Sequence, residues 1–254
     1  MEQYQRPAEL LLHARYAIAL TGAGISVESG IPDFRGKDGL WARYDPMEYA
    51  HIDSFRRNPA KVWNMLAEMD ELIASVEPND AHRALAVLER LGVLRTVVTQ
   101  NIDSLHQRAG SRDVVEFHGN FRTFSCDECY KGYARGEVSL EKRPPLCKCG
   151  GPLRPDIVFF GEGIPEDAHA RAVEAAGRCD LMLVIGTSAS VVPASYLPRV
   201  AKSRGASILE INPSLSELSA WATDVHVMEP AAGAMRGIMA AIAEINPDFK
   251  DVDR

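Results

Sequence analysis

Short apolar segments that alternate with helical patterns constrain the fold of this chain more than any other feature. Segments such as 16–20 (YAIAL) and 180–185 (DLMLVI) are short and rich in apolar residues, which is typical of strands buried in a parallel sheet. Strands that alternate with helices predict a doubly wound, Rossmann-like α/β sheet. The predicted strands are 16–20, 95–99, 114–117, 180–185, 207–211 and 224–228, and the predicted helices are 7–15, 79–91, 104–110, 166–178, 194–204 and 232–244.

Polar and glycine-rich groups follow the predicted strands. In an open parallel sheet, ligands bind outside the carboxyl ends of the strands, so these groups are expected to converge on one crevice. Glycines there would let a phosphate approach the backbone N–H groups closely. A nucleotide site is therefore predicted, formed by Gly22-Ala23-Gly24, Gln100-Asn101-Ile102-Asp103, His118-Gly119, Gly186-Thr187-Ser188 and Asn212-Pro213-Ser214.

The glycine turn alone leaves two interpretations open. Val27 stands at the third glycine position of a G-x-G-x-x-G fingerprint, so the turn itself could be purely structural. The loop that follows places Asp33, Phe34 and Arg35 in a row after Pro32, and proline argues against a helix there. This loop is expected either to cover a bound nucleotide or to be a solvated surface loop.

Two segments interrupt the alternation of strands and helices. Apolar and aromatic residues at helical spacing fill residues 37–78, which predicts a helical insertion. Residues 121–155 carry four of the five cysteines. We expect these two insertions to pack together as a smaller second domain above the crevice, while residues 1–36, 79–120 and 156–254 form the Rossmann-like domain.

The cysteines of the second insertion form two close pairs. Cys126 and Cys129 are separated from Cys147 and Cys149 by seventeen residues, a pattern that indicates a zinc ribbon. Four thiolates in tetrahedral geometry suit zinc and leave no open position for water, so the metal is expected to be structural. The short C-x-C spacer strains ligation by Cys149. Cys179 precedes an apolar strand and is expected to be an inert core thiol.

Charge and hydropathy exclude several classes of function. The formal net charge is −7 and no basic run is present, so the chain has no electrostatic footprint for nucleic acid. No apolar stretch is long enough to span a bilayer, and the N-terminus lacks the cationic start and long apolar region of a signal peptide. A cytoplasmic protein is expected, and cysteines in that compartment rarely form a disulfide framework.

Together, these motifs resemble the sirtuin family of NAD-dependent protein-lysine deacylases, of the bacterial or archaeal type. The cysteine pairs and the motifs GAGISVESGIPDFRG, TQNIDSLHQRAG, FHGN, RPDIVFFGE, GTS and INPS occur in the order of that family, over nearly the whole chain. The resemblance implies transfer of the acetyl group of acetyl-lysine to ADP-ribose, with release of nicotinamide, O-acetyl-ADP-ribose and free lysine. It also implies NAD as co-substrate, a structural zinc ion, and acetylated lysine in extended peptide segments as the partner.

The resemblance further implies roles for individual residues. His118 and Asn101 would be catalytic, His118 as the base that takes a proton from a ribose hydroxyl once the acyl-lysine carbonyl oxygen has attacked the ribose carbon; histidine titrates nearest neutral pH. Two segments would pair with the substrate peptide as an added strand. The implied NAD contacts are Gly22, Ala23, Gly24, Ile25, Asp33, Phe34, Arg35, Gln100, Asn101, Ile102, Asp103, Gly186, Thr187, Ser188, Asn212, Pro213, Ser214 and Ala232; the implied peptide contacts are Val158, Phe159, Phe160, Gly161, Glu162, Gly163, Ser190, Val191 and Val192; and the implied zinc ligands are Cys126, Cys129, Cys147 and Cys149.

The other histidines, by contrast, lack a setting at a strand end. His13, His51, His82, His106, His169 and His226 are therefore interpreted as structural or exposed.

The helical insertion carries a prediction about the acyl group. Some bacterial sirtuins that prefer succinyl-lysine resemble one another in having a tyrosine and an arginine three residues apart, just after the tryptophan that corresponds to Trp63. The matching residues here are Met65 and Glu68, and neither can donate a hydrogen bond to a buried carboxylate. Met65 offers a flexible apolar surface instead. Deacetylation is therefore predicted, with acceptance of longer neutral acyl groups and little desuccinylation.

Three other functions compete with this interpretation. A dehydrogenase would use the same fold, but the fingerprint lacks its third glycine. A non-catalytic module that binds NAD or ADP-ribose would not need His118 and the complete QNID group. A serine hydrolase is disfavoured because GTSAS is not a G-x-S-x-G elbow. Bound NAD with no spectroscopic hydride change would separate a sirtuin from the dehydrogenase, and release of nicotinamide that depends on an acylated peptide would separate it from the non-catalytic module.

Overall fold

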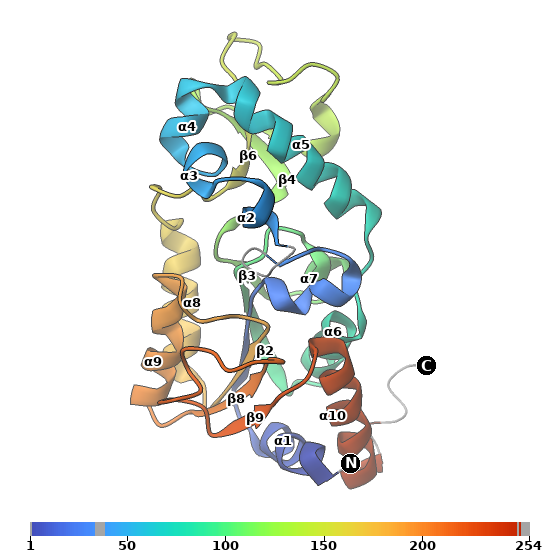
Figure 1. Ribbon diagram of the computed structural model, residues 1–254. Coiled ribbons are helices and arrows are strands. Elements are labelled where there is room, and N and C mark those ends of the chain that lie inside the picture. The colour runs from blue at the N-terminus through green and yellow to red at the C-terminus, as the bar shows by residue number, and fades with distance from the viewer. Residues whose placement is uncertain (1, 34–38, 248, 250–254) are drawn as a thin grey trace.

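The larger part of the protein is a six-stranded parallel sheet. The computed structural model describes residues 2–33, 39–247 and 249, and its main sheet has the strand order β3-β2-β1-β7-β8-β9, with each neighbouring pair parallel. The predicted doubly wound sheet is confirmed (Figure 1). Its strands are β1 (Ala17–Thr21), β2 (Leu94–Thr99), β3 (Val114–Glu116), β7 (Leu181–Ile185), β8 (Ser207–Ile211) and β9 (Val225–Val227).

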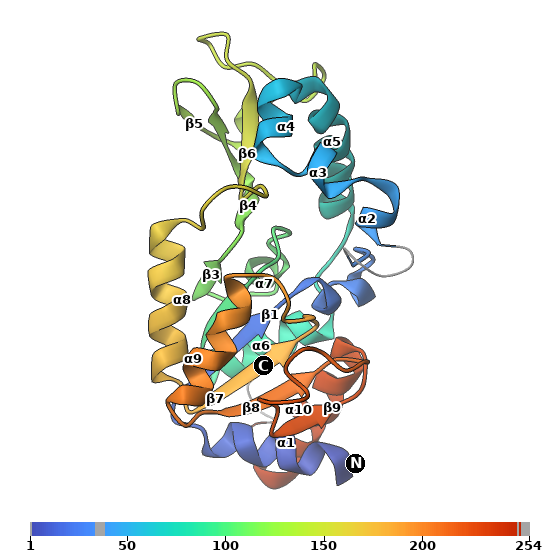
Figure 2. The same cartoon turned by 60° about the vertical axis from the view of Figure 1, so that its left-hand side comes forward.

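Helices cover both faces of this sheet (Figure 2). Alternate residues of each strand point to opposite faces; in β1, Ala17 and Ala19 join one hydrophobic core, and Ile18 and Leu20 join the other. The first core packs against α1 (Glu2–His13), α6 (Asp80–Arg90) and α10 (Ala231–Ile245). The second packs against α8 (Glu166–Arg178) and α9 (Leu197–Ser203).

The first helix begins earlier than the sequence indicates. The predicted range 7–15 placed Pro7 in the first turn, but α1 begins at Glu2 and Pro7 lies inside the helix. Packing explains the difference, because the Tyr4 ring lies directly over Gly237 of α10, where a Cβ atom would overlap it. Tertiary packing supplies most of the stability of a helix in a protein, and here it extends α1 past the proline that lacks an N–H.

The smaller domain combines an antiparallel sheet with short helices. The sheet has the order β5-β4-β6, and one shared core contains residues from both insertions. The Trp63 ring stacks on Phe124 with ring centroids 6.1 Å apart, and its Nε1 donates to the carbonyl of Leu153 at 2.8 Å. Ile157 and Phe159, just beyond residues 121–155, pack in the same core. The elements are α2 (Leu40–Arg43), α3 (Pro46–Tyr49), α4 (Ile52–Arg57), α5 (Pro59–Ser75), β4 (Gly119–Cys126), β5 (Gly132–Ala134) and β6 (Leu153–Ile157).

Short elements connect the two domains to the crevice. Two single 3₁₀ turns, η1 (Ala23–Ile25) and η2 (Val27–Ser29), follow β1, and α7 (Leu105–Arg108) follows β2. Among the described residues, no helix has the length and apolar character needed to cross a membrane.

Candidate active site

A cavity of about 620 Å³ lies where the strands of the large sheet end, and residues of the small domain such as Met65 and Met69 also line it. The sheet changes direction between β1 and β7, because successive strands are added to opposite sides of this pair. Such a switch point is where open α/β sheets bind ligands. The predicted residues that line the cavity are Gly22, Ala23, Gly24, Asp33, Gln100, Asn101, Ile102, His118, Val158, Phe159, Phe160, Gly161, Glu162, Gly186, Thr187, Ser188, Val191, Val192, Asn212, Pro213 and Ser214.

The remaining predicted residues lie elsewhere. Asp103 lines a smaller, apolar pocket that adjoins the cavity through Ala23, Asn101 and Ile102. Ile25 is fully buried in the core under the glycine turn. Gly163, Ser190 and Ala232 are not among the residues of the cavity wall, and the N–H of Ala232 donates to the carboxylate of Glu28 at 2.6 Å. Phe34 and Arg35 lie outside the described residues.

The glycine turn forms the floor of the cavity. The N–H of Gly24 donates to the carbonyl of Gly186 at 2.8 Å, so the loops after β1 and β7 are in direct backbone contact. A Cβ atom on Gly24 would lie 2.7 Å from Cα of Gly186. Gly24 is therefore required by the close approach of two backbones, which also leaves the floor open to a ligand.

The substitution Gly24→Ala is expected to force these two loops apart. Overpacking of this kind costs about 1–3 kcal/mol, and the displaced turn should also lose affinity for NAD. Urea unfolding and an NAD-binding titration would measure both effects. Gly136→Ala is the matched control, because a Cβ atom there has nothing within 4 Å; equal unfolding midpoints for the two variants would contradict the prediction.

A buried polar cluster lies at the inner end of the cavity. Nδ2 of Asn101 donates to the carbonyl of Gly22 and to Oγ of Ser26, both at 3.1 Å. The Ser26 hydroxyl donates in turn to Oδ2 of Asp103 at 2.7 Å. Oδ1 of Asn101 is buried and has no partner among the described residues. This oxygen can accept a hydrogen bond from a ligand, such as the amide of a nicotinamide.

Ser26 was missed by sequence reasoning. It is 1% exposed, and it connects Asn101 to Asp103 through its hydroxyl. The only signal in the sequence is a hydroxyl two residues after the glycine turn, which is not distinctive. Burial raises the pKa of the Asp103 carboxyl, and the hydrogen bonds from the Leu105 N–H and the Ser26 hydroxyl oppose that rise.

Two neutral histidines lie next to this cluster. The His82 and His106 rings lie 4.9 Å apart; burial lowers the pKa of His82 to about 4 and that of His106 well below its usual value. His106 Nε2 lies 2.9 Å from the Thr21 hydroxyl, which donates to the Thr99 hydroxyl. Thr99 accepts the N–H of Asn101 at 3.1 Å, so this chain of contacts fixes the backbone of Asn101.

His118 reaches the cavity between the two sheets. Its Nδ1 lies 3.0 Å from the carbonyl oxygen of Gln100. A carbonyl oxygen only accepts, so Nδ1 carries the proton and Nε2 is left with a free lone pair. Burial lowers the pKa of His118, and the bond to Gln100 partly opposes this. The ring is therefore a neutral imidazole that can accept a proton at Nε2.

The segment after β6 forms one wall of the cavity. The Phe160 N–H donates to the carbonyl of Ala50 at 2.8 Å, and its carbonyl accepts the Ile52 N–H at 3.0 Å. The Glu162 carboxylate accepts two bonds from Arg154 at 2.7 Å each and one from the Phe159 N–H at 3.0 Å. The wall is thus held on one side by the helical insertion and cross-linked within itself.

Helix α5 forms the apolar roof. Met65 and Met69, one turn apart, both line the cavity, and Met69 also lines the adjoining pocket. Glu68 is not part of the wall; its carboxylate accepts a bond from Arg43 at 2.8 Å. The sequence does not predict this role for Met69, because an apolar residue at helical spacing is typical of core packing.

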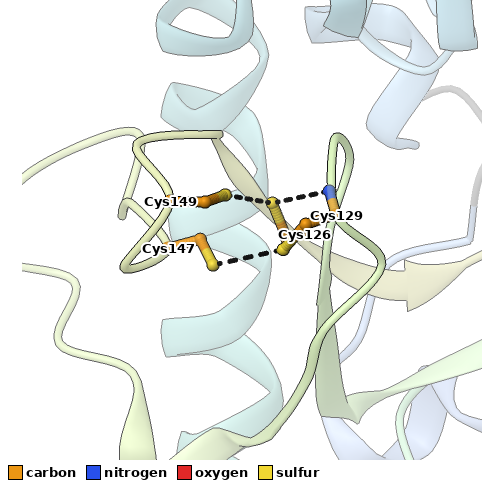
Figure 3. A group of neighbouring side chains, drawn as sticks. All are labelled: Cys126, Cys129, Cys147 and Cys149. Carbon is orange, nitrogen blue, oxygen red and sulfur yellow. Dashed lines mark hydrogen bonds between the residues drawn. The ribbon is translucent and has the colours of Figure 1, made fainter.

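The four cysteines of the small domain meet at one point (Figure 3). Their sulfur atoms all lie within 4.8 Å of one another, and the pairs Cys126–Cys149 and Cys129–Cys147 are each 3.6 Å apart. Tetrahedral zinc with Zn–S bonds of about 2.3 Å would separate its sulfurs by about 3.8 Å, so the arrangement fits zinc. Cys149 takes its place in spite of the short spacer. No cysteine lines the cavity, which agrees with a structural metal.

Cys179 lies apart from this group. It is buried, its thiol donates to the carbonyl of Ala176 at 3.3 Å, and burial raises its pKa to about 12. A thiol of this kind is unreactive.

Comparison with known proteins finds a matching family model and similar relatives. The family model of the Sir2 family matches residues 22–193. NAD-dependent protein deacylase 2 of Pyrobaculum aerophilum is 51% identical over 206 residues, or 81% of this chain and 82% of the relative. NAD-dependent protein deacylase 1 of Archaeoglobus fulgidus is 50% identical over 213 residues, or 82% and 86%.

Solved structures of Sir2 proteins are also similar to this chain. The crystal structure of a Sir2 homologue in complex with NAD superposes with a TM-score of 0.87 at 42% identity, covering 96% of this chain and 94% of the other. A Sir2 variant in complex with a deacetylated p53 peptide and 3′-O-acetyl ADP-ribose superposes with a TM-score of 0.89 at 36% identity, covering 94% and 98%.

Proposed function

Since the chain belongs to the Sir2 family, we propose that this NAD-dependent protein deacylase is a deacetylase, which transfers the acetyl group of acetyl-lysine to ADP-ribose and releases nicotinamide. The observation that carries the proposal is the state of His118. Its Nδ1–H is bound to the Gln100 carbonyl, so Nε2 is the ring nitrogen left to act as a base, and the residue lines the same cavity as Asn101.

Different residues of the crevice would bind different parts of the dinucleotide. The backbone of the glycine turn would hold the phosphates of the dinucleotide, and Ser188 and Asn212 its adenosine end. Asn101 and Asp103 would hold the nicotinamide amide, because Oδ1 of Asn101 is buried and has no partner in the part of the chain that the structure describes. NAD, when bound, supplies a ribose carbon that can accept the acyl oxygen as nicotinamide leaves. His118 Nε2 would take the proton of a ribose hydroxyl, and the apolar walls exclude competing water.

The substrate would enter as an extended segment between two lips of the cavity. One lip is the wall at Val158–Glu162, and the other carries Val191 and Val192. Val192 is 61% exposed, so it is available for contact with a partner strand. A Sir2 protein bound to a p53 peptide and NAD, with a TM-score of 0.86 at 36% identity, supports a peptide as the partner class.

A direct assay tests this function. The protein would be incubated with NAD and an acetyl-lysine peptide while nicotinamide and O-acetyl-ADP-ribose are both followed. Equal amounts of the two products, formed only when the peptide is acetylated, are expected. A change in the redox state of NAD, or binding of NAD with no product, would contradict the proposal.

The acyl group removed is expected to be neutral. Met65 and Met69 form an apolar roof, and Glu68 adds a negative charge beside it that Arg43 partly neutralises. A succinyl carboxylate would lose its water there and gain no cation, which is costly. On one peptide sequence, we expect acetyl-lysine to be cleaved at least tenfold faster than succinyl-lysine, a ratio that corresponds to about 1.4 kcal/mol.

The double substitution Met65→Tyr with Glu68→Arg should increase desuccinylation by supplying two donors. Glu71→Arg is the matched control. This substitution makes the same charge change on α5, but the Glu71 side chain is 71% exposed and pairs with Arg143. Equal cleavage of succinyl- and acetyl-lysine by the unmodified protein would overturn the prediction.

A further inference from the structure

One buried carboxylate has no role in the reaction described above. Glu210 lies on β8, two residues before Asn212, and its side chain is 0% exposed. Two hydroxyl groups donate to its Oε2 atom, Ser219 at 2.9 Å and Thr223 at 2.5 Å. Its other oxygen, Oε1, has no partner among the described residues. No Lys or Arg side chain in the described part of the chain forms an ion pair with it.

Burial of a carboxylate without a cation beside it costs free energy and is an unfavourable means of stabilising a fold. Its charge loses hydration, and only hydrogen bonds compensate for that loss. An apolar residue would suit the surroundings better, since the neighbouring Ile208, Leu218 and Ala222 belong to one hydrophobic core. Both of its donors lie on the same loop, so the carboxylate ties that loop to β8.

That loop joins β8 to β9 and forms part of the cavity wall. Asn212, Pro213, Ser214 and Leu215 line the cavity at its start. The rest of the loop, residues 216–223, contains no helix or strand. Three successive N–H groups, from residue 221 to residue 223, all point to the carbonyl of Leu218, and this tight turn is the part that Glu210 holds.

The same loop also contacts the end of β7. The N–H of Glu217 donates to the carbonyl of Ser188 at 3.2 Å, and Ser188 lines the cavity next to the glycine floor. Ser219, which donates to Glu210, also accepts the N–H of Ser216 at 2.9 Å. Hydrogen bonds from Glu210 to Ser219 and from Ser219 to Ser216, followed by the peptide link from Ser216 to Glu217, therefore connect the buried carboxylate to the backbone of Ser188.

We propose that Glu210 is a positioning residue for the adenosine end of the dinucleotide: its carboxylate holds the loop 214–223 in place, so that Ser188 and Ser214 are correctly placed to bind the ligand. The inference rests on the proposed function, because it takes the ligand to be NAD. It assigns Glu210 no contact with the ligand, since Glu210 is not part of the cavity wall.

ADP-ribose is the probe that isolates this effect, because it carries the adenosine end of NAD but no nicotinamide. In a calorimetric titration, Glu210→Gln should bind ADP-ribose about tenfold more weakly than the unmodified protein, since it loses the charge that strengthens both hydrogen bonds. The KM for NAD should rise by a similar factor. The value of kcat and the inhibition by nicotinamide should stay within twofold, because no hydrogen bond in the described part of the chain runs directly from this loop to Asn101, Ser26 or Asp103.

Glu217→Gln is the matched control. It removes the same charge from the same loop, but its side chain is exposed and is not part of the cavity wall, so ADP-ribose affinity should be unchanged. Thr223→Val removes one donor at nearly constant volume and should show a smaller loss of ADP-ribose affinity than Glu210→Gln. It is the variant to measure if Glu210→Gln does not fold.

Two results would overturn the proposal. The first is ADP-ribose binding by Glu210→Gln, or by Thr223→Val in its place, that equals binding by the unmodified protein. The second is a parallel loss of ADP-ribose affinity, kcat and nicotinamide inhibition, which would indicate a general loosening of the fold. If the unmodified protein itself fails to bind ADP-ribose, the proposed function fails, and the inference fails with it.

Discussion

Replacement of His118 by alanine is expected to lower kcat for acetyl-peptide by about 10²–10⁴-fold, the usual contribution of a general base. The imidazole is oriented by a single bond from Nδ1 to the Gln100 carbonyl, and alanine offers no lone pair in place of Nε2. Affinity for ADP-ribose should remain near that of the unmodified protein, because the residues proposed to bind the phosphates and the adenosine follow other strands. Single-turnover kinetics with NAD and acetyl-peptide would measure the loss directly.

His169→Ala provides the control for this experiment. The rings of His118 and His169 both lie near Phe117, at centroid distances of 5.6 Å and 6.3 Å, but His169 is exposed and is not part of the cavity wall. Its loss should leave kcat unchanged. An unchanged turnover in His118→Ala would show that another group, or water, acts as the base.

The pH profile gives a second view of the same residue. Burial lowers the pKa of His118 below its usual value of about 6.5. A base acts in its deprotonated form, so kcat/KM should rise as the pH increases through this lowered pKa and should already be constant at neutral pH. In His118→Ala the acidic limb assigned to this group should disappear from the residual activity.

Removal of the metal is expected to unfold the small domain and abolish activity. Four thiolates at 3.6 Å and similar distances repel one another unless a cation lies between them, and the binding energy of structural zinc is folding energy. Metal analysis should find about one zinc per chain. After treatment with a strong chelator, amide hydrogen exchange should become fast in β4 and β6, while α10, in the core of the other domain, stays protected.

Substitutions can separate the metal effect from a general cysteine effect. Cys126→Ala and Cys147→Ala remove buried members of the group and should reproduce the effect of the chelator. Cys179→Ala removes a buried thiol outside the group, so it should keep both zinc and activity. Folded, fully active protein that contains no zinc would contradict the assignment.

The loss of activity should be indirect. The cysteines are not part of the cavity wall, but Trp63 donates to the Leu153 carbonyl and lies on α5, the helix that also carries Met65. Cys126 ends β4 and pairs across the sheet with Leu153. Loss of order around the metal would therefore disturb the roof of the cavity, because both pack in the same hydrophobic core of the small domain.

The sequence predicts the sheet well because its local signals agree with one another. Glycine and polar groups mark the ends of strands, and helix α6, with its cap at Asn79, lies within the predicted range 79–91. Helix α1 shows the limit of this approach, because its first turn is stabilised by Gly237 more than two hundred residues away. No local pattern records such a contact.

The same limit applies to the site. Residues at strand ends, such as Asn101 and His118, were predicted because topology brings strand ends together. Ser26, Met69 and Glu210 were not, because their roles arise from burial and from partners distant in sequence. Cys149 was placed in the metal group by its neighbours in the chain, although its spacing was unfavourable, and this prediction agrees with the geometry.

The position of His118 between the two sheets has a mechanical consequence. The residue before it, Phe117, is bonded to the Thr99 carbonyl of the large sheet, whereas its own carbonyl accepts the Val158 N–H beside the small sheet. Gly119 follows with φ of 75°, a conformation that few other residues adopt. The orientation of the His118 ring is therefore set by both sheets at once, because its backbone is tied to the large sheet on one side and to the small sheet on the other. A change in the relative placement of the two sheets would turn the proton acceptor, so the geometry of the base depends on the whole arrangement of the domains and not on one strand end alone.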